Sequence, residues 1–364
     1  MKVYVHVPFC RSKCAYCDFY STPRTELMEK YVDTVGMEWT HRDGDGLGDI
    51  STIYVGGGTP SSLPVESLVR MLSVFPAGSR LAECTVEANP DDVTPGWVER
   101  LTCGTVVNRV SMGIQSFDDG ELRFIGRRHS GRRAEEAFAT LREGGIGNIS
   151  CDLIYGLPGQ TLRSWERSIE RMLALRPEHI SAYLLSYEPR TRLGVMLEQG
   201  KVEEADERTA CAMYDMLCTA LRRAGYVHYE ISNFALPGRE AIHNSGYWDG
   251  SDYIGLGPGA HSMIDGVRSY NPSDLRGYVA SRGEAFGIVE EENELERLND
   301  RIITSLRTSA GLDTTGLDAY PEVMAEVERL MAEGELIATQ PGRVAIPEER
   351  WLRSDAVMRR LIVV

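Results

Sequence analysis

The sequence lacks several features that mark common protein classes. No apolar run approaches the ~20 residues of a membrane-spanning helix, and the first residues, MKVYVHVPFC, lack the apolar core of a secretion signal. Basic residues are in the minority, 39 against 54 acidic ones, and the net charge of −15 argues against a nucleic-acid binder. The eight cysteines follow no regular pairing pattern, which is typical of reduced thiols. We therefore expect a cytoplasmic protein with no membrane span and no nucleic acid as a partner.

A fourth cysteine is missing from a cluster near the start of the chain. Cys10, Cys14 and Cys17 are separated by three and then two residues, and the next cysteine is Cys84. An apolar, alternating run precedes them, so they are expected on a loop just after a strand. Four-cysteine zinc and ferredoxin sites need one more thiolate than this loop supplies. Three possibilities stay open: a four-iron cluster with one open iron, a zinc site completed by His6 or Cys84, or three buried thiols.

Strand-like runs alternate with amphipathic stretches of helical period over the first half of the chain. Such alternation predicts βα units around a parallel sheet with right-handed crossovers. Six units are too few for an eight-stranded barrel, so we predict an α/β fold built on an incomplete (β/α)6 barrel, with its chemistry at the carboxyl ends of the strands. The predicted strands are Lys2–Val7, Ser51–Val55, Cys84–Glu87, Val106–Ile114, Asn148–Ile154 and His179–Leu185. The predicted helices include Glu26–Thr40, Val65–Phe75, Gly131–Glu143 and Leu162–Leu175.

The pattern changes after about residue 225. Tyr226–Phe234 and Asp252–Ser262 are short, aromatic and punctuated by glycine, which predicts an extra sheet lying against the barrel. Near the end, two predicted helices precede a two-stranded ribbon, an order that resembles a winged-helix module. The predicted organisation is a barrel over 1–225, a small α/β extension with a connecting segment over 226–290, and a winged-helix-like domain over 291–364.

Glycines and polar residues stand at or after the ends of the predicted strands. Three consecutive glycines, Gly56 to Gly58, would let the backbone approach a ligand closely, whereas a tight turn explains only one of them. Acids there can accept hydrogen bonds from ribose hydroxyls, and an arginine can clamp a carboxylate. Taken singly, each is more often a surface ion pair or a helix cap. The candidate positions are Gly57, Gly58, Thr59, Glu87, Gln115, Arg127 and Asp152.

The cysteine loop, CxxxCxYC, resembles the cluster loop of radical S-adenosylmethionine (SAM) enzymes. That resemblance implies a [4Fe–4S] cluster on Cys10, Cys14 and Cys17, with SAM bound at the open iron. It also implies that the glycine-rich motif holds the amino group of SAM. The order of the later polar residues resembles the SAM-binding positions of the oxygen-independent coproporphyrinogen III oxidases and their relatives, and Tyr4 matches one more of these positions. The resemblance covers nearly the whole chain.

Three features separate this chain from the oxidases themselves. The oxidases resemble CxxxCxxCxC, and this chain has Phe19 where they have the last cysteine. The chain also starts almost directly at its first strand, without the N-terminal extension that helps the oxidases enclose their substrate. Residues His243 to Trp248 fit HNxxYW, a motif associated with heme binding in chaperones of the HemW type. Within it the resemblance implies a heme site of His243, Asn244, Tyr247 and Trp248, with the imidazole on iron and the aromatic rings against the porphyrin. The alternative is that the aromatic residues pack the extra sheet and His243 holds a loop.

The resemblance therefore implies a heme chaperone with three cofactors: a [4Fe–4S] cluster, SAM and heme. Its expected partners are heme, an electron donor for the cluster, and heme-accepting respiratory proteins at the cytoplasmic face of the membrane. The alternative is an enzyme, an oxygen-independent coproporphyrinogen III dehydrogenase that makes protoporphyrinogen IX by radical decarboxylation. Phe19, the early first strand and HNxxYW favour the chaperone, and no catalytic residue is assigned.

Overall fold

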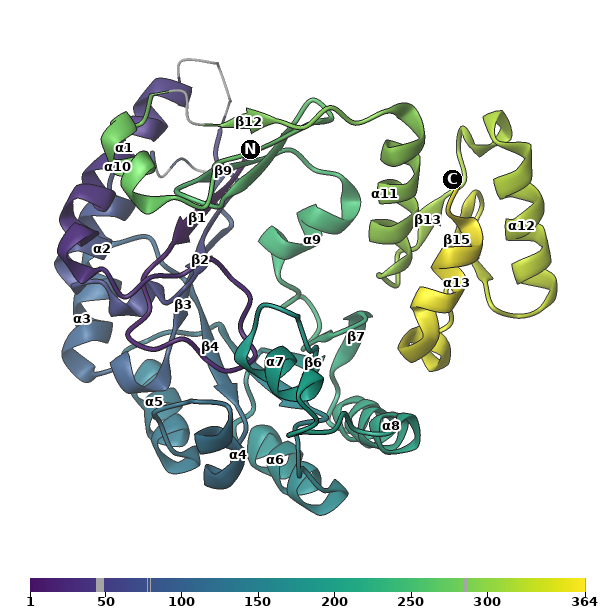
Figure 1. The fold of residues 1–364 in the computed structure, drawn as a ribbon, viewed down its shortest axis with the longest axis horizontal. Coiled ribbons are helices and arrows are strands. Elements are labelled where there is room, and N and C mark those ends of the chain that lie inside the picture. Colours follow the sequence, from purple (N-terminus) through teal and green to yellow (C-terminus); the bar gives the residue numbers. More distant parts are fainter. Residues whose placement is uncertain (44–48, 77, 79, 285–286, 364) are drawn as a thin grey trace.

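One mixed sheet of twelve strands organises the chain in the computed structural model, which describes residues 1–43, 49–76, 78, 80–284 and 287–363. Its centre is a set of six parallel strands in sequence order (Figure 1). They are β1 Lys2–Val7, β2 Thr52–Gly57, β3 Glu83–Ala88, β4 Arg109–Gln115, β5 Ile149–Tyr155 and β6 His179–Leu184. All six strands were predicted from the sequence, and the structure confirms each with small shifts at the ends.

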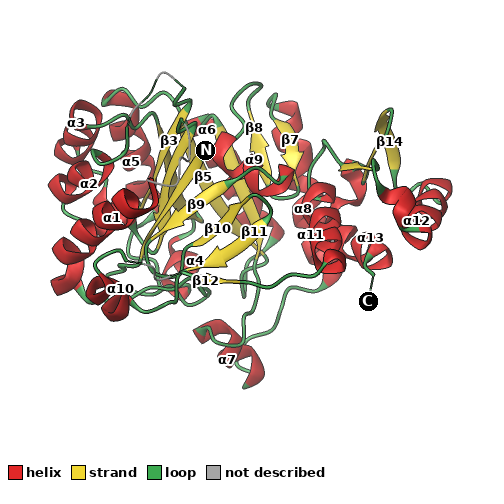
Figure 2. Cartoon of the chain, turned by 90° about the horizontal axis from the view of Figure 1, so that it is seen from above, coloured by secondary structure: helices red, strands yellow, loops and turns green. Residues whose placement is uncertain are grey.

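Helices cover the outer side of these strands (Figure 1). They are α1 Met28–Asp43, α2 Val65–Leu72, α3 Pro95–Gly104, the short α4 Asp119–Phe124, α5 Gly131–Glu143, α6 Leu162–Leu175 and α8 Glu207–Arg223. Side-chain caps fix several of their starts: Ser130 accepts from the amide of Arg133, and Thr161 forms a capping box with Ser164. The four predicted helices are therefore confirmed. The helix α7 Arg192–Glu198 follows β6 and lies apart from the others, beyond the ends of the strands (Figure 2).

Alternation along the strands separates an apolar layer from a polar interior. On β4, Val110, Met112 and Ile114 are fully buried and belong to the hydrophobic core. The residues that alternate with them, Arg109, Ser111 and Gly113, line the cavity on the opposite side of the sheet. Because successive side chains of a strand point to opposite faces, the same strands stabilise the fold with one face and build the site with the other.

The strands after residue 225 extend the same sheet at both edges, so the prediction of a separate sheet against the barrel is wrong. β7 Val227–Glu230 and β8 Asn233–Ala235 follow β6 in an antiparallel arrangement. At the other edge, β9 Tyr253–Leu256 pairs in parallel with β1. The sheet then continues through β10 His261–Ile264, β11 Val267–Tyr270 and β12 Ile288–Val289. The physical reason is that each edge of an incomplete barrel leaves backbone groups unpaired, and these strands pair with them.

The C-terminal module packs helices around a small antiparallel sheet and lies at one end of the molecule, beyond α8 (Figure 2). Its helices are α11 Glu294–Leu306, α12 Pro321–Ala332 and α13 Ser354–Leu361, and its strands are β13 Leu312–Asp313, β14 Ile337–Gln340 and β15 Arg343–Ala345. The two predicted helices and the ribbon are present, whereas β13 and α13 were not predicted. The winged-helix assignment and the domain boundaries stay predictions.

Polar contacts join this module to the rest of the chain. Glu348, in a 3-10 helix over Glu348–Arg353, accepts from Arg222 of α8 at 2.7 Å and lies 3.1 Å from Nδ1 of His228 on β7. Between β7 and β8, the amide of Ile231 donates to the carbonyl of Arg307. No helix in the described part of the chain is both long and apolar enough to cross a membrane.

Candidate functional site

A cavity of about 510 Å³ opens at the carboxyl ends of the six parallel strands. Most of the predicted site residues line this one cavity, although they come from segments far apart in the sequence. They are Cys10, Cys14, Cys17, Gly57, Gly58, Thr59, Glu87, Gln115, Arg127, Asp152 and Asn244. Tyr4, His243, Tyr247 and Trp248 are predicted site residues outside this lining.

The three cysteines of the loop are free thiols that face the cavity. Cys10 Sγ lies 3.3 Å from Thr59 Oγ1, and Arg127 Nη1 donates to Cys14 Sγ at 3.6 Å. Burial raises the pKa of Cys10 and of Cys17, so that a nearby cation or metal is needed to hold them as thiolates.

The spacing of the sulfur atoms distinguishes between a single ion and a larger group. Two thiolates on one zinc ion, with Zn–S bonds of about 2.3 Å, are at most about 4.6 Å apart. Among the described residues, the only three His, Cys, Asp or Glu ligand atoms within 4.8 Å of one another belong to Cys218, His228 and Glu348. In the described structure the three loop sulfurs are therefore not all within 4.8 Å of one another, which is wider than the spacing that one zinc ion requires.

The two residues considered as a fourth ligand are both committed elsewhere. His6 holds the carbonyl of Tyr20 at 2.9 Å with Nε2 and the hydroxyl of Tyr4 at 3.1 Å with Nδ1. Cys84 is fully buried, and burial raises its pKa to about 12. Neither residue is therefore available as a fourth ligand in the described structure.

Each of the three glycines at the end of β2 has a packing or backbone reason to lack a side chain. Gly57 has a φ of +103°, and a Cβ on Gly58 would lie 2.9 Å from the carbonyl oxygens of Val7 and Phe9. A Cβ on Gly56 would lie 2.9 Å from Glu87 Oε1. Because these residues have no side chain, the cysteine loop and the third strand can approach this turn closely. A ligand role for Gly57 and Gly58 stays a prediction.

Glu87 and Asp152 are half-buried acids of the cavity lining on β3 and β5, the strands that flank β4. Glu87 accepts from the hydroxyl of Tyr54 at 2.8 Å and from the amide of Gly57 at 3.2 Å. Burial raises the pKa of Glu87 to about 7 and that of Asp152 to about 6. Both acids therefore change charge close to neutral pH, and a ligand that needs them ionised will bind in a pH-dependent way.

Gln115 reaches the cavity through a distortion of β4. The register with β5 shifts between Gly113 and Gln115, and Gln115 has a φ of +70°. A left-handed conformation at a residue other than glycine stores strain of about 1–3 kcal/mol and is concentrated at functional sites. The bulge turns the amide of Gln115 into the cavity lining.

Arg127 follows α4 and is held from three directions. It donates to Asn89 Oδ1 at 2.6 Å, to the carbonyl of Gly113, and to Cys14 Sγ. The guanidinium thus lies beside the cysteine loop, where it can neutralise a carboxylate brought in by a ligand.

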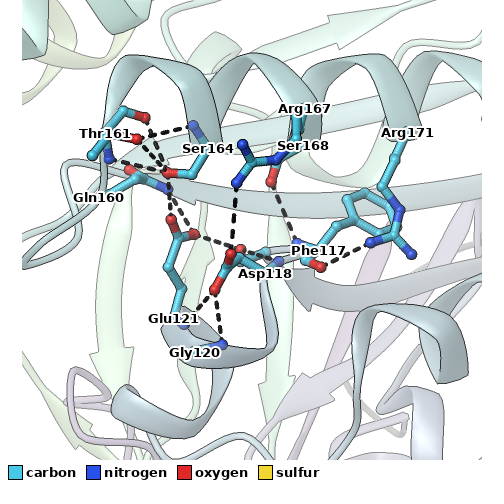
Figure 3. Close-up of polar contacts among 11 residues, drawn as sticks. Phe117, Asp118, Gly120, Glu121, Gln160, Thr161, Ser164, Arg167, Ser168 and Arg171 are labelled. Atoms are coloured by element: carbon cyan, nitrogen blue, oxygen red, sulfur yellow. Dashed lines mark hydrogen bonds and ion pairs between the residues drawn. The ribbon is translucent and has the colours of Figure 1, made fainter.

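A buried carboxylate fixes the segment that carries Arg127. Glu121 on α4 accepts from Ser164 at 2.8 Å and from Gln160 at 3.0 Å, both at the start of α6 (Figure 3). It also accepts from Ser116, just beyond β4, at 2.5 Å. In the same close-up, Asp118 caps α4 through the amides of Gly120 and Glu121. These contacts join the end of β4 to α4 and α6.

The HNxxYW motif forms the helix α9 Ile242–Asp249, which lies inside the curve of the sheet (Figure 1). His243 is fully buried, with Nδ1 2.8 Å from Thr52 Oγ1 and Nε2 3.0 Å from the hydroxyl of Tyr247. Burial lowers the pKa of His243 to about 3, so this imidazole is neutral. Glu83 accepts from the amides of Ile242 and His243 at the start of the helix. The imidazole expected on heme iron is therefore buried in this structure, with both ring nitrogens in hydrogen-bond contact.

The members of the motif face different surroundings. Asn244 lines the cavity, whereas Trp248 is half-buried beneath the guanidinium of Arg307, at 5.0 Å from ring centroid to Cζ. Tyr4 lies beside the cavity, with its ring 6.5 Å from that of His243 and 6.2 Å from that of Tyr54. The rings of Tyr4, Tyr54, Tyr247 and His243 lie next to one another and form a ring layer beside the cavity.

Several lining residues were not among the sequence-based candidates. Arg109 on β4 and Tyr183 on β6 face the cavity, and Asn89 holds Arg127 there. The signal that could have identified the first two is the two-residue alternation, since Arg109 shares a face with Ser111 and Tyr183 shares one with Ser181. Phe19, which is 65% exposed, also belongs to the lining.

Comparison with known proteins identifies the family. The radical SAM superfamily model matches residues 4–172. The heme chaperone HemW of Bacillus subtilis is 36% identical over 318 residues, which cover 85% of this chain and 84% of that protein. The chain belongs to the HemW family of radical SAM proteins. Membership of the radical SAM superfamily implies a [4Fe–4S] cluster and SAM as cofactors.

Other HemW relatives match over more of the chain. The heme chaperone HemW of Mycobacterium tuberculosis (strain H37Rv) is 32% identical over 372 residues, covering 99% of this chain and 94% of that protein. A mitochondrial radical S-adenosyl methionine domain-containing protein 1 of Danio rerio is 31% identical over 377 residues, covering 96% of this chain and 82% of that protein.

The solved structure of coproporphyrinogen III oxidase (HemN) from Escherichia coli superimposes with a TM-score of 0.83 over 100% of this chain and 90% of that one. At 21% identity, that likeness shows the shared fold alone.

Proposed function

We propose that this chain is a heme chaperone of the radical SAM class, which binds a [4Fe–4S] cluster, SAM and heme and passes heme to other proteins. The observation that carries the proposal is the 36% identity to the HemW of Bacillus subtilis over 85% of the chain. The sequence adds Phe19 and the HNxxYW motif. The expected recipients are respiratory proteins at the cytoplasmic face of the membrane, and the cluster needs an electron donor.

For the cluster and SAM, the cavity supplies a donor set of suitable chemistry. Cys10, Cys14 and Cys17, which line the cavity together, would hold the cluster. The bound cluster and SAM together supply one-electron chemistry, while the protein binds and orients them. The residues proposed to contact SAM are Tyr4, Gly57, Gly58, Thr59, Glu87, Gln115, Arg127 and Asp152.

Each proposed SAM contact has a stated task. Arg127 would neutralise the methionyl carboxylate of SAM. Its hydrogen bond to Cys14 Sγ keeps the guanidinium beside the cysteine loop. Glu87 and Asp152 would accept hydrogen bonds from ribose hydroxyls, a task that requires their ionised forms. Gln115 would contribute its amide from the bulge of β4.

For heme, the proposed site is His243, Asn244, Tyr247 and Trp248 on α9. Both ring nitrogens of His243 already have hydrogen-bond partners, so iron ligation by this residue requires α9 to give up the bond to Thr52 or to Tyr247. Trp248 is more accessible than His243 and offers an indole surface for the porphyrin. Heme binding at α9 would therefore be accompanied by a local rearrangement.

The alternative function is that of an oxygen-independent coproporphyrinogen III dehydrogenase. The test is to reconstitute the cluster under anaerobic conditions and to measure heme binding and coproporphyrinogen III decarboxylation on the same preparation. Stable heme binding without a decarboxylated product supports the chaperone. Formation of protoporphyrinogen IX would make the enzyme the correct assignment.

A further inference from the structure

Arg109 is a buried cation in the wall of the cavity. Arg109 is 1% exposed, and its side chain is among the largest fully buried ones in the described structure. It stands at the start of β4, on the same face as Ser111 and Gly113, and all three line the cavity. Because β4 runs toward the cavity mouth, Arg109 is the deepest of the three.

This guanidinium has few direct partners. Nη1 donates to Thr85 Oγ1 at 3.4 Å, which is long for a hydrogen bond, and Nε has no hydrogen-bond partner among the residues that the structure describes. A buried charge with so little direct compensation is costly to the fold. Its presence therefore points to a role that acts through its charge.

The neighbouring strands place two acids above Arg109. In the parallel register Glu87 of β3 lies opposite Ser111, and Asp152 of β5 lies opposite Gly113. Arg109 is thus two residues below the level of Glu87 and four below that of Asp152, on the strand between them. At about 3.3 Å per residue, Arg109 lies roughly 7 Å from the level of Glu87 and roughly 13 Å from that of Asp152 along the strand direction, and all three residues line the same cavity.

We propose that Arg109 is a positioning residue that favours the ionised forms of Glu87 and Asp152, so that both can accept hydrogen bonds from the ribose hydroxyls of SAM. The inference rests on the SAM site of the proposed function and adds to it a residue that does not itself touch the ligand. Without a cation below them, two acids facing one cavity would repel each other and take up protons.

The electrostatics of the two acids support this role. For Asp152, burial is the largest effect on the pKa and raises it, and Arg109 is the strongest of the effects that lower it, ahead of Arg127. For Glu87, burial is the largest effect and raises the pKa, and the Asp152 charge raises it further. The hydrogen bonds from Tyr54 and from the amide of Gly57 lower it, and Arg109 lowers it by a smaller amount. Arg127 is assigned to the carboxylate of SAM, so Arg109 is the cation that remains for the acids.

The other titratable groups around the acids are neutral and cannot replace Arg109. Tyr54, which donates to Glu87, and Tyr183, beside Asp152, both have pKa values raised by burial. His179, near Arg109 on β6, and His243 on α9 have pKa values lowered by burial, so both are uncharged at neutral pH. Tyr4 and Tyr247 act on Glu87 from the ring layer and are also protonated.

The test compares the pH dependence of SAM binding in cluster-reconstituted wild-type protein, Arg109→Met and Arg109→Lys. The ratio of the variant to the wild-type dissociation constant cancels the titration of SAM itself. A rise of about one pKa unit in the acids weakens SAM binding by about tenfold at pH 7. For Arg109→Met we therefore expect a ratio of about ten at pH 7 that returns toward one at pH 9. Arg109→Lys keeps the charge, so its ratio is expected to stay near one. Arg133→Met, a half-buried arginine on α5 outside the cavity, is the matched control.

A ratio for Arg109→Met that is the same at every pH would overturn the proposal, because a purely structural defect weakens binding without changing its titration. Infrared spectra of the protein without SAM supply a second readout. Arg109→Met should show more protonated carboxyl signal at pH 7 than wild type, and adding Asp152→Asn should reduce it. An unchanged carboxyl signal would also overturn the proposal. If wild type binds no SAM at any pH, the proposed SAM site fails, and the infrared result still decides whether Arg109 favours the ionised forms of the acids.

Discussion

Arg307, just beyond α11, lies over the indole ring of Trp248 on α9, with 5.0 Å between Cζ and the ring centroid. The same guanidinium donates to Glu230 Oε1 at 3.0 Å. Glu230 is 1% exposed and is held further by the amide of Ser232 and the side chain of Asn233. The C-terminal module therefore covers part of the helix proposed to contact heme, and any movement of α9 changes the surface on which this module docks.

Arg307→Ala is expected to destabilise the docking of the C-terminal module. The change removes a cation–π contact and leaves the buried Glu230 with one partner fewer, at a cost of about 1–3 kcal/mol in the free energy of unfolding. Urea denaturation and limited proteolysis around residues 230 and 307 measure it. Arg297→Ala, on an exposed position of α11, is the control. Equal stability of the two variants would mean that this contact does not hold the module.

Cys14→Ser is expected to abolish the iron and sulfide content of reconstituted protein, since Cys10 and Cys17 alone cannot hold the cluster. The same loss is expected for Cys10→Ser and Cys17→Ser. Cys103, which is exposed on α3, and Cys211 on α8 should tolerate serine with full iron content. Iron and sulfide analysis with the visible absorption spectrum checks this, and a normal cluster in Cys14→Ser would refute the ligand assignment.

Arg127→Ala is expected to weaken SAM binding, because it removes a charge-assisted contact worth about 1.5–3 kcal/mol. That corresponds to roughly one to two decades in the dissociation constant. The matched control is the next residue, Arg128→Ala, whose guanidinium lies 3.5 Å from Asp91 and 3.8 Å from Asp92 outside the SAM contacts. Equilibrium dialysis of the reconstituted proteins gives both affinities. Equal SAM affinity in the two variants would place the carboxylate contact elsewhere.

His243 gives a prediction about stability and pH. Burial lowers its pKa from the ordinary value of 6.5 to about 3, so below pH 6.5 the unfolded chain binds a proton that the folded chain does not. The free energy of unfolding therefore falls as pH decreases from 6.5 toward 3, with a contribution of up to about 1.4 kcal/mol per pH unit. Denaturation curves of His243→Gln should show a shallower dependence on pH over this range, whereas His41→Gln, at an exposed position of α1, should match wild type. The same slope in His243→Gln and wild type would show that this imidazole is not buried in the neutral form.

The sequence was most informative where neighbouring residues in the chain determine the structure. Alternation of apolar residues located all six parallel strands, and Cys10, Cys14 and Cys17 belong to one loop, so their proximity needed no knowledge of the fold. The polar residues at the strand ends met in one cavity because the carboxyl ends of parallel strands meet at one edge of a sheet.

The features that the sequence did not reveal depend on contacts between distant segments. His243 is bonded to Thr52, 191 residues away, and nothing near either residue in the sequence indicates that pairing. The pairing of β9 with β1 is similarly remote, which is why the extension was expected as a separate sheet. Arg109 escaped notice because an arginine at the start of a strand is usually exposed, and only the assembled sheet shows that it is 1% exposed.

The central claim is that this chain binds heme and does not convert coproporphyrinogen III. The most direct measurement is a heme titration followed by the Soret band on anaerobically reconstituted protein, with product analysis of coproporphyrinogen III, SAM and a low-potential reductant on the same sample. We predict saturable heme binding and no decarboxylated product, and we predict weaker heme binding in His243→Ala and Trp248→Ala. Phe19→Cys, which restores the oxidase spacing, is expected to leave heme binding unchanged. Formation of protoporphyrinogen IX by the wild-type protein would contradict the account, as would the absence of saturable heme binding.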